Sequence, residues 1–161
     1  MYDGTAVGSD DNDGYTAETP VLTMEAALAK AQSVADQNGV ALDQITVYMV
    51  NPLEVTDDKE LDGGNLTLQA WDGRDYDSDV LFYMDQGARL TLRNVTLTPR
   101  QIAENDEDIN NKQLVWNRDG VLTLDNNVTA RGSFVLDFCA QESVKAWNCL
   151  LYTSPSPRDR G

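Results

Sequence analysis

Histidine is absent from this chain of 161 residues, and basic residues are scarce. Without histidine the usual general base near neutral pH is missing, which excludes Ser-His-Asp and Cys-His catalytic systems and histidine-ligated zinc or iron sites. The 12 Lys and Arg residues face 27 Asp and Glu residues, so the formal net charge is −15. Because this surplus repels phosphate backbones and anionic lipid headgroups, we expect no nucleic-acid partner and no binding to anionic membranes.

The sequence also has no long apolar run and only two cysteines. No window approaches the roughly 18 uncharged apolar residues of a membrane span, so we expect no membrane insertion. The two cysteines are Cys139 and Cys149. Residues 149–159 match, residue by residue, the translation of an adapter used in transposase-based sequencing libraries. We therefore interpret residues 149–161 as a non-native tail, encoded where the gene was cut within a domain. Because Cys149 lies in that tail, only Cys139 is native and we expect no disulfide.

The N-terminal part of the chain predicts a polar loop followed by one α-helix. Residues 8–14 read Gly-Ser-Asp-Asp-Asn-Asp-Gly, which is typical of tight turns because glycine accepts positive φ and Asn and Asp bond to the nearby backbone. Thr23 is a suitable N-cap for a helix from about residue 24 to 38, and Gly39 is a suitable residue to end it. The helix has an apolar stripe formed by Ala27, Leu28, Ala31, Val34 and Ala35.

After Gly39 the sequence changes to short segments that alternate apolar with polar residues and are broken by Gly, Asn and Asp. This pattern is typical of β-strands, and no second helix is predicted. The expected strands cover residues 45–50, 65–69, 80–84, 90–92, 94–98, 114–116, 121–124, 128–130 and 134–138.

Two stretches of the strand region repeat. Residues 81–96 match residues 114–129 with an offset of 32 to 33, and both contain Leu-Thr-Leu, then Asn, then Val-Thr. An acidic insert, residues 100–112, accounts for part of that offset, and without it the unit is about 20 residues long. Repeats of this length predict a solenoid of stacked parallel strands about 4.8 Å apart.

Together these segments resemble a known family, the right-handed parallel β-helix proteins of the pectate-lyase-like superfamily. The resemblance rests on Gly-x-Asp-x-Asn-Asp-Gly at 8–14, Thr-x-Glu-x-Pro at 16–20, the Ala-Leu pair at 27–28, and the Leu-Thr-Leu-x-Asn-Val-Thr repeat. Within this superfamily the sequence most resembles the large surface proteins of anaerobic gut bacteria, which carry such solenoids as binding or adhesive modules. The implied fold class is an all-β solenoid, a right-handed parallel β-helix with an N-terminal capping α-helix. Its implied parts are a polar loop over 1–22, the capping helix over 23–39 and truncated β-helix coils over 40–148, and the adapter match adds the non-native tail over 149–161.

For function, the resemblance implies a non-catalytic, extracellular module of a bacterial surface protein or adhesin that binds a glycan or a host surface ligand. We expect no signal peptide within this fragment. One alternative is the N-terminal part of a calcium-dependent polysaccharide lyase whose active site lies in coils beyond residue 148. The superfamily's hydrolases use histidine and Asn-Thr-Asp motifs that this sequence lacks, so no catalytic residue is assigned. A second alternative is a β-sandwich carbohydrate-binding domain, in which 80–98 and 114–130 would pair antiparallel.

The acidic residues supply the candidate metal ligands. Asp75, Asp77 and Asp79 would face one side of an extended segment and gather a Ca²⁺ ion there, or they form a solvated acidic corner. The loop at 9–20 departs from an EF-hand, because Ser9 and Pro20 occupy positions that need strong oxygen ligands. We therefore favour a hydrogen-bonded turn for that loop over a looser calcium site.

Aromatic and asparagine residues supply the remaining candidates. Trp71, Trp116 and Trp147 are either platforms for sugars or packing residues, and packing is the more conservative interpretation. Arg74 and Tyr76 are weaker candidates for sugar contacts. Asn65, Asn94 and Asn127 each begin an Asn-x-Thr triplet, which is a glycosylation pattern but more plausibly marks strand edges and turns.

Overall fold

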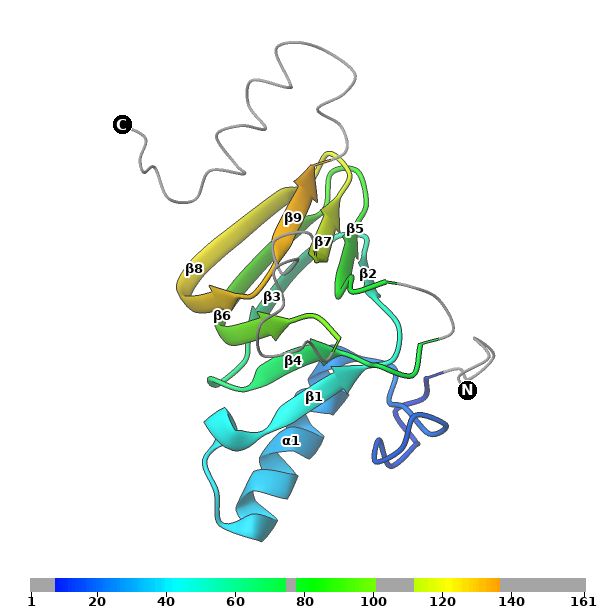
Figure 1. Ribbon diagram of the computed structural model, residues 1–161, viewed down its shortest axis with the longest axis vertical. Helices are drawn as coiled ribbons and strands as arrows, with labels where there is room; N and C mark the ends of the chain where they lie inside the picture. The colour runs from blue at the N-terminus through cyan, green and yellow to red at the C-terminus, as the bar shows by residue number, and fades with distance from the viewer. Residues whose placement is uncertain (1–7, 75–77, 101–111, 137–161) are drawn as a thin grey trace.

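The structure is a computed structural model that describes residues 8–74, 78–100 and 112–136. Within these ranges one α-helix is followed by nine strands, of which β6 and β8 have ten residues and the others three to five (Figure 1). The elements are α1 (Met24–Asn38), the 3-10 helix η1 (Leu42–Gln44), β1 (Thr46–Met49), β2 (Leu53–Val55), β3 (Asp58–Asp62), β4 (Thr67–Ala70), β5 (Phe82–Met84), β6 (Arg89–Thr98), β7 (Gln113–Asn117), β8 (Val121–Ala130) and β9 (Ser133–Leu136).

The strands form two sheets in which every observed pair is parallel. The first, sheet A, has the order β1-β4-β6-β3, with β8 also paired to β6. The second, sheet B, has the order β2-β5-β7-β9. The two repeated stretches lie beside each other, so that Leu90-Thr91-Leu92 pairs in register with Leu122-Thr123-Leu124. This confirms the predicted parallel pairing of the Leu-Thr-Leu segments, and it is not the antiparallel pairing that a β-sandwich would need.

The predicted fold class, an all-β solenoid with a right-handed parallel β-helix over residues 40–148, is wrong. The described residues form a mixed α/β fold of one α-helix and two parallel sheets, neither of which is closed or continues as a solenoid. The long strand β6 is the physical reason. It pairs with β3 along its first half and with β4 along its second, so strands that a regular coil would place on separate faces share one open sheet.

The helix is as the sequence predicts. The Thr23 side chain accepts a hydrogen bond from the Ala26 N–H, and Gly39 ends the helix in the left-handed conformation with φ of 63°. Met24, Ala31 and Ala35 are buried, and the helix covers the end of the hydrophobic core next to β1 (Figure 1). None of the helices in the described part of the chain has the length and apolar character that crossing a bilayer would need.

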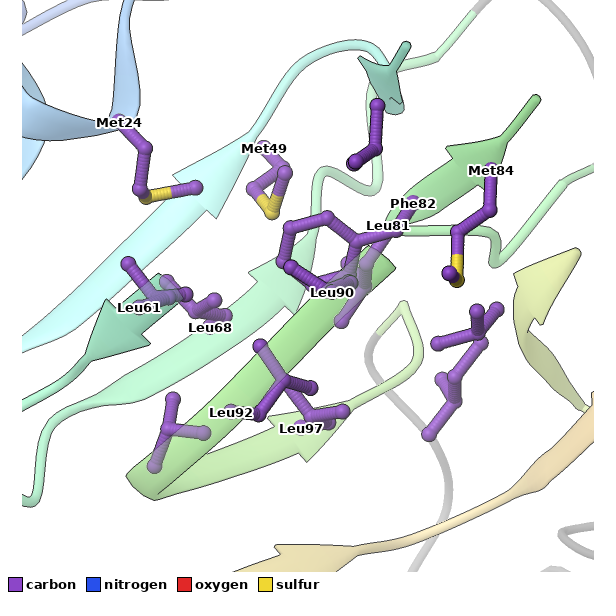
Figure 2. Close-up of a cluster of buried hydrophobic side chains, with 14 of the residues drawn as sticks. Met24, Met49, Leu61, Leu68, Leu81, Phe82, Met84, Leu90, Leu92 and Leu97 are labelled. Atoms are coloured by element: carbon purple, nitrogen blue, oxygen red, sulfur yellow. The ribbon is translucent and has the colours of Figure 1, made fainter. Parts of the chain in front are cut away.

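The core lies between the two sheets and is built from the inward side chains of successive strands. Leucine and methionine side chains from sheets A and B meet around Phe82, which is fully buried (Figure 2). Each fully buried side chain of this size contributes roughly 1.5–3 kcal/mol to the free energy of unfolding. The residues with no exposed surface are Leu66, Leu68, Ala70, Leu81, Phe82, Met84, Ala88, Leu90, Leu92, Leu97, Leu114 and Val115.

Three asparagines mark the bends that precede strand segments of sheet A. Asn65, Asn94 and Asn127 have φ of 77°, 52° and 50°, a conformation that asparagine accepts more readily than most residues. The Asn94 side-chain amide donates to the Asp62 carboxylate at 3.1 Å, and the Asn127 amide donates to the Asn94 side-chain oxygen at 3.2 Å. Asn65 lies in the turn before β4, which confirms the prediction of strand edges and turns there, whereas Asn94 and Asn127 lie within β6 and β8 and bend those strands.

Candidate functional site

A groove with a volume of about 710 Å³ lies between the N-terminal loop, α1 and the edge of sheet A. Its volume is typical of pockets that hold small-molecule ligands. The walls are mainly apolar, and the polar side chains include Lys30 of α1, Asn51 after β1 and Glu54 of β2. An apolar groove with a few polar groups can bind and orient a ligand.

Three aromatic residues give the groove its chemical character. Tyr15 and Tyr48 line it with 63% and 51% of their surface exposed, and Trp71 lines it half-buried. The rings of Tyr48 and Trp71 meet edge to face, with centroids 5.5 Å apart and planes at 75°. This arrangement is favourable for aromatic pairs and fixes the orientation of the exposed Tyr48 ring.

A tight turn holds Trp71 in place. The Trp71 N–H donates to the Met49 carbonyl at 3.0 Å, and the Arg74 N–H donates to the Trp71 carbonyl at 3.3 Å. A Cβ atom at Gly73 would lie 2.5 Å from the Trp71 indole nitrogen, so the turn needs glycine at that position. The Trp71 ring therefore packs directly over its own turn.

Arg74 anchors this turn to both sheets. Its side chain is 7% exposed, and its guanidinium donates hydrogen bonds to the carbonyls of Met49 and Val50 at the end of β1. It also donates to the carbonyls of Ser78 and Val80, which precede β5. The suggestion that Arg74 contacts a sugar is wrong, because this side chain is buried and binds backbone carbonyls. Its role is to position the turn that carries Trp71.

The outer face of sheet A carries rows of polar side chains beside the groove. Register places Thr46, Thr67, Thr96 and Thr129 next to one another on four neighbouring strands. In the next row Tyr48 pairs with Gln69. Hydroxyl and amide groups both donate and accept hydrogen bonds, so this face can bind other hydroxyl-bearing molecules.

A second aromatic pair lies on the outer face of sheet B. Register aligns Glu54, Tyr83, Trp116 and Val135 across four strands. Tyr83 is 40% exposed, and its ring centroid lies 6.4 Å from that of Trp116 with planes at 54°. Trp71 and Trp116 therefore both lie partly exposed on outer sheet faces, whereas Trp147 is outside the described residues. Neither tryptophan belongs to the buried core, but each packs against a tyrosine ring, so packing and sugar binding both stay predictions for these residues.

The acidic N-terminal loop is a hydrogen-bonded turn, as favoured from the sequence. The Asp10 carboxylate accepts from the Leu22 and Thr23 N–H groups and from the Thr23 hydroxyl, all at 2.9 Å. Hydrogen bonds from the Thr23 N–H and hydroxyl lower the pKa of Asp10. Asp13 accepts from the Tyr15 N–H, which lowers its pKa in the same way. These carboxylates thus stabilise the loop that forms one wall of the groove.

The predicted calcium ligands do not form a cluster that the structure describes. Asp75 and Asp77, with Tyr76, lie outside the described residues. Asp79 is 9% exposed, and its carboxylate is paired with the Arg100 guanidinium at 3.0 Å and accepts the Arg100 N–H at 2.9 Å. No group of three acidic or cysteine side chains within residues 8–74, 78–100 and 112–136 is placed to hold a metal ion. Cys139, Cys149 and the adapter-like tail at 149–161 also lie outside these ranges.

The sequence identifies one of the three aromatic residues that line the groove. It pointed to Trp71, but it did not point to Tyr15 or Tyr48, because a single tyrosine in a loop or short strand has no distinguishing pattern. Only the register of β1 and β4 brings Tyr48 beside Trp71. No protein-family model matches this chain, and neither a curated protein nor a solved structure matches it.

Proposed function

We propose that the chain is a non-catalytic binding module of an extracellular cell-surface protein, and that it holds a neutral glycan in the groove beside Tyr48 and Trp71. The observation that carries the proposal is the ordered pair of aromatic rings, one of them half exposed, at the groove of about 710 Å³. Aromatic side chains supply a large, rigid apolar face together with a polar tip. Sugar rings present the complementary surface, with apolar C–H faces and hydroxyl edges.

The polar groups around the aromatic pair support a hydroxyl-rich ligand. Thr46 and Asn51 line the groove with Tyr48, and Thr67 adjoins Thr46 on the next strand. Each of these side chains both donates and accepts hydrogen bonds, as sugar hydroxyls do. The groove therefore offers apolar stacking and two-way hydrogen bonding within one site.

The charge of the chain supports a neutral glycan over an acidic one. The net charge is −15, and Glu54 lines the groove. Of the described residues that line it, Lys30 alone is basic, and Lys30 lies close enough to the Asp13 carboxylate to lower its pKa. A polyuronate would therefore meet a repulsive field with little local compensation.

The test is binding of the full chain to a panel of neutral and acidic polysaccharides, by affinity electrophoresis and then calorimetry. We expect binding to at least one neutral polymer, and we expect Tyr48→Ala to weaken it at least about tenfold, equivalent to about 1.4 kcal/mol. Tyr83→Ala is the matched control, because it removes a similarly exposed tyrosine from sheet B, and its affinity should stay within about twofold of the unsubstituted chain.

Two binding results would contradict the proposal. One is the absence of neutral-polysaccharide binding, and the other is a Tyr48→Ala variant that binds as well as the unsubstituted chain. Release of an ultraviolet-absorbing product from pectate in the presence of calcium would contradict the non-catalytic role and favour a lyase.

A further inference from the structure

A row of threonines crosses sheet A, starting from the groove. Register places Thr46 of β1 beside Thr67 of β4. It places Thr67 beside Thr96 of β6, and Thr96 beside Thr129 of β8. We call these four residues the threonine row. Thr46 also lines the groove, so the row begins at the site described above and leads away from α1 strand by strand (Figure 1).

The side chains of the threonine row point away from the core. Side chains alternate between the two faces of a strand, and the residue after each threonine belongs to the core or packs against it. Those inward residues are Val47, Leu68, Leu97 and Ala130. Among the described residues, none forms a hydrogen bond with a hydroxyl of the row. Each hydroxyl can therefore donate to and accept from a ligand.

The threonine row is uncharged, unlike the other half of sheet A. In that half Arg93 forms ion pairs with Glu60 at 3.1 Å and with Asp125 at 3.0 Å. The residues that pair beside the start of the row, Tyr48 and Gln69, are neutral as well. A charged ligand would find no opposite charge along this strip, so the strip favours a neutral one.

The spacing of the threonine row fits a ligand built from repeated units. Neighbouring strands lie about 4.8 Å apart, so four strands present one hydroxyl per strand over roughly 14 Å. A sugar unit in an extended polysaccharide is about as long as one strand spacing, and each unit repeats the same hydroxyls. A chain that crosses the strands would therefore place one unit over each strand, where it meets the same side chain each time.

From these observations we propose that the groove and the threonine row bind one linear, neutral polysaccharide along its length, a proposal that rests on the glycan-binding function proposed above. The sugar chain runs across β1, β4, β6 and β8. One unit stacks at Tyr48 and Trp71, and the units that follow hydrogen-bond to the hydroxyls of the row. The preferred ligand is an internal segment of several units, because a ligand too short to leave the groove does not reach those hydroxyls.

The test is calorimetry of the full chain with disaccharides and hexasaccharides of linear β-linked glucan, mannan and xylan, with NMR titration for the weaker ligands. We expect the hexasaccharide of at least one series to bind at least about tenfold more tightly than its disaccharide. The double variant Thr67→Val/Thr96→Val removes two hydroxyls from the row, and valine keeps the branched shape that strands favour. It should weaken hexasaccharide binding at least about fivefold and leave disaccharide binding within about twofold.

Thr91→Val/Thr123→Val is the matched control. It makes the same changes on the paired strands β6 and β8, on the same face of sheet A but outside the row, and should leave both affinities within about twofold.

Four outcomes would overturn the proposal. Equal affinities for the two lengths, with Tyr48→Ala still weakening both, would remove the extended site and leave the proposed glycan-binding function in place. Equal losses in the two double variants would do the same, as would a neutral polymer that binds when no hexasaccharide does. Absence of binding by every neutral oligosaccharide and polymer would overturn the extended site and the glycan-binding function together.

Discussion

Replacement of Arg74 by methionine is the sharpest test of how the groove is held together. Methionine keeps a long, flexible, largely apolar side chain but removes every hydrogen-bond donor of the guanidinium. In the folded protein those donors reach four carbonyls at 2.9–3.3 Å, which belong to Met49, Val50, Ser78 and Val80. The substitution therefore leaves four backbone acceptors at the junction of sheets A and B without this partner.

The magnitude follows from the number and burial of these bonds. A buried acceptor that loses its donor costs about 1–3 kcal/mol, and water that enters the vacated space recovers part of the total. We expect Arg74→Met to lower the free energy of unfolding by about 3–5 kcal/mol, which is a large fraction of the roughly 5–15 kcal/mol of a typical domain. Glycan binding should weaken too, because the turn that carries Trp71 loses its anchor.

The assay is urea unfolding of the full chain, followed by tryptophan fluorescence and circular dichroism. Arg89→Met is the matched control, because Arg89 is an exposed arginine on β6 and its loss should change stability by less than about 0.5 kcal/mol. A loss below about 1 kcal/mol for Arg74→Met, or equal losses for the two variants, would refute the assignment of Arg74 as the anchor.

Three further predictions test the loop, a bend and the core. Hydrogen bonds from Thr23 lower the pKa of Asp10 below the value of about 3.9 expected in the unfolded chain. The contribution of Asp10 to folding stability is therefore present above about pH 4 and is lost as the pH falls through the lowered pKa. Asp10→Asn should flatten the loss of stability in an acid titration followed by circular dichroism. Asn94→Ala should be about 1 kcal/mol less stable in urea unfolding than Asn94→Gly, because both variants lose the amide but only alanine resists φ of 52°. Equal stabilities would contradict the left-handed conformation at residue 94. Leu92→Ala should lower the free energy of unfolding by about 2–5 kcal/mol, because Leu92 is fully buried. Leu124→Ala should lower it by less than about 1 kcal/mol, because Leu124 is 38% exposed. A larger loss for Leu124→Ala than for Leu92→Ala would contradict this assignment of the core.

The sequence predicts those features that depend on neighbouring residues. Thr23 and Gly39 bound the helix as expected, since an N-cap side chain and a left-handed glycine act within one turn. The Leu-Thr-Leu repeat predicts parallel pairing because identical apolar patterns favour the same register. The strands β2 and β3 were missed, since Leu53–Val55 has three residues and Asp58–Asp62 is mostly charged.

Features that depend on distant residues were beyond sequence reasoning. Arg74 reads as a surface residue, and its burial follows only from carbonyls that lie 24 and 25 residues away along the chain. Asp79 reads as a metal ligand because nothing nearby in the sequence reveals its pairing with Arg100. The fold class was wrong for a related reason, because the sequence does not reveal that β6 joins β3 and β4 in a single open sheet.

The asparagine bends have a practical consequence for producing the protein. In a eukaryotic secretory pathway, the triplets that begin at Asn65, Asn94 and Asn127 are acceptor sites for N-linked oligosaccharides. The Asn94 amide is already engaged with Asp62 and Asn127, so a sugar attached there during synthesis would have to displace both contacts before β6 and β8 align. Expression in insect or mammalian cells would therefore give a heterogeneous product with an impaired bend, whereas a bacterial host leaves these amides free to form it.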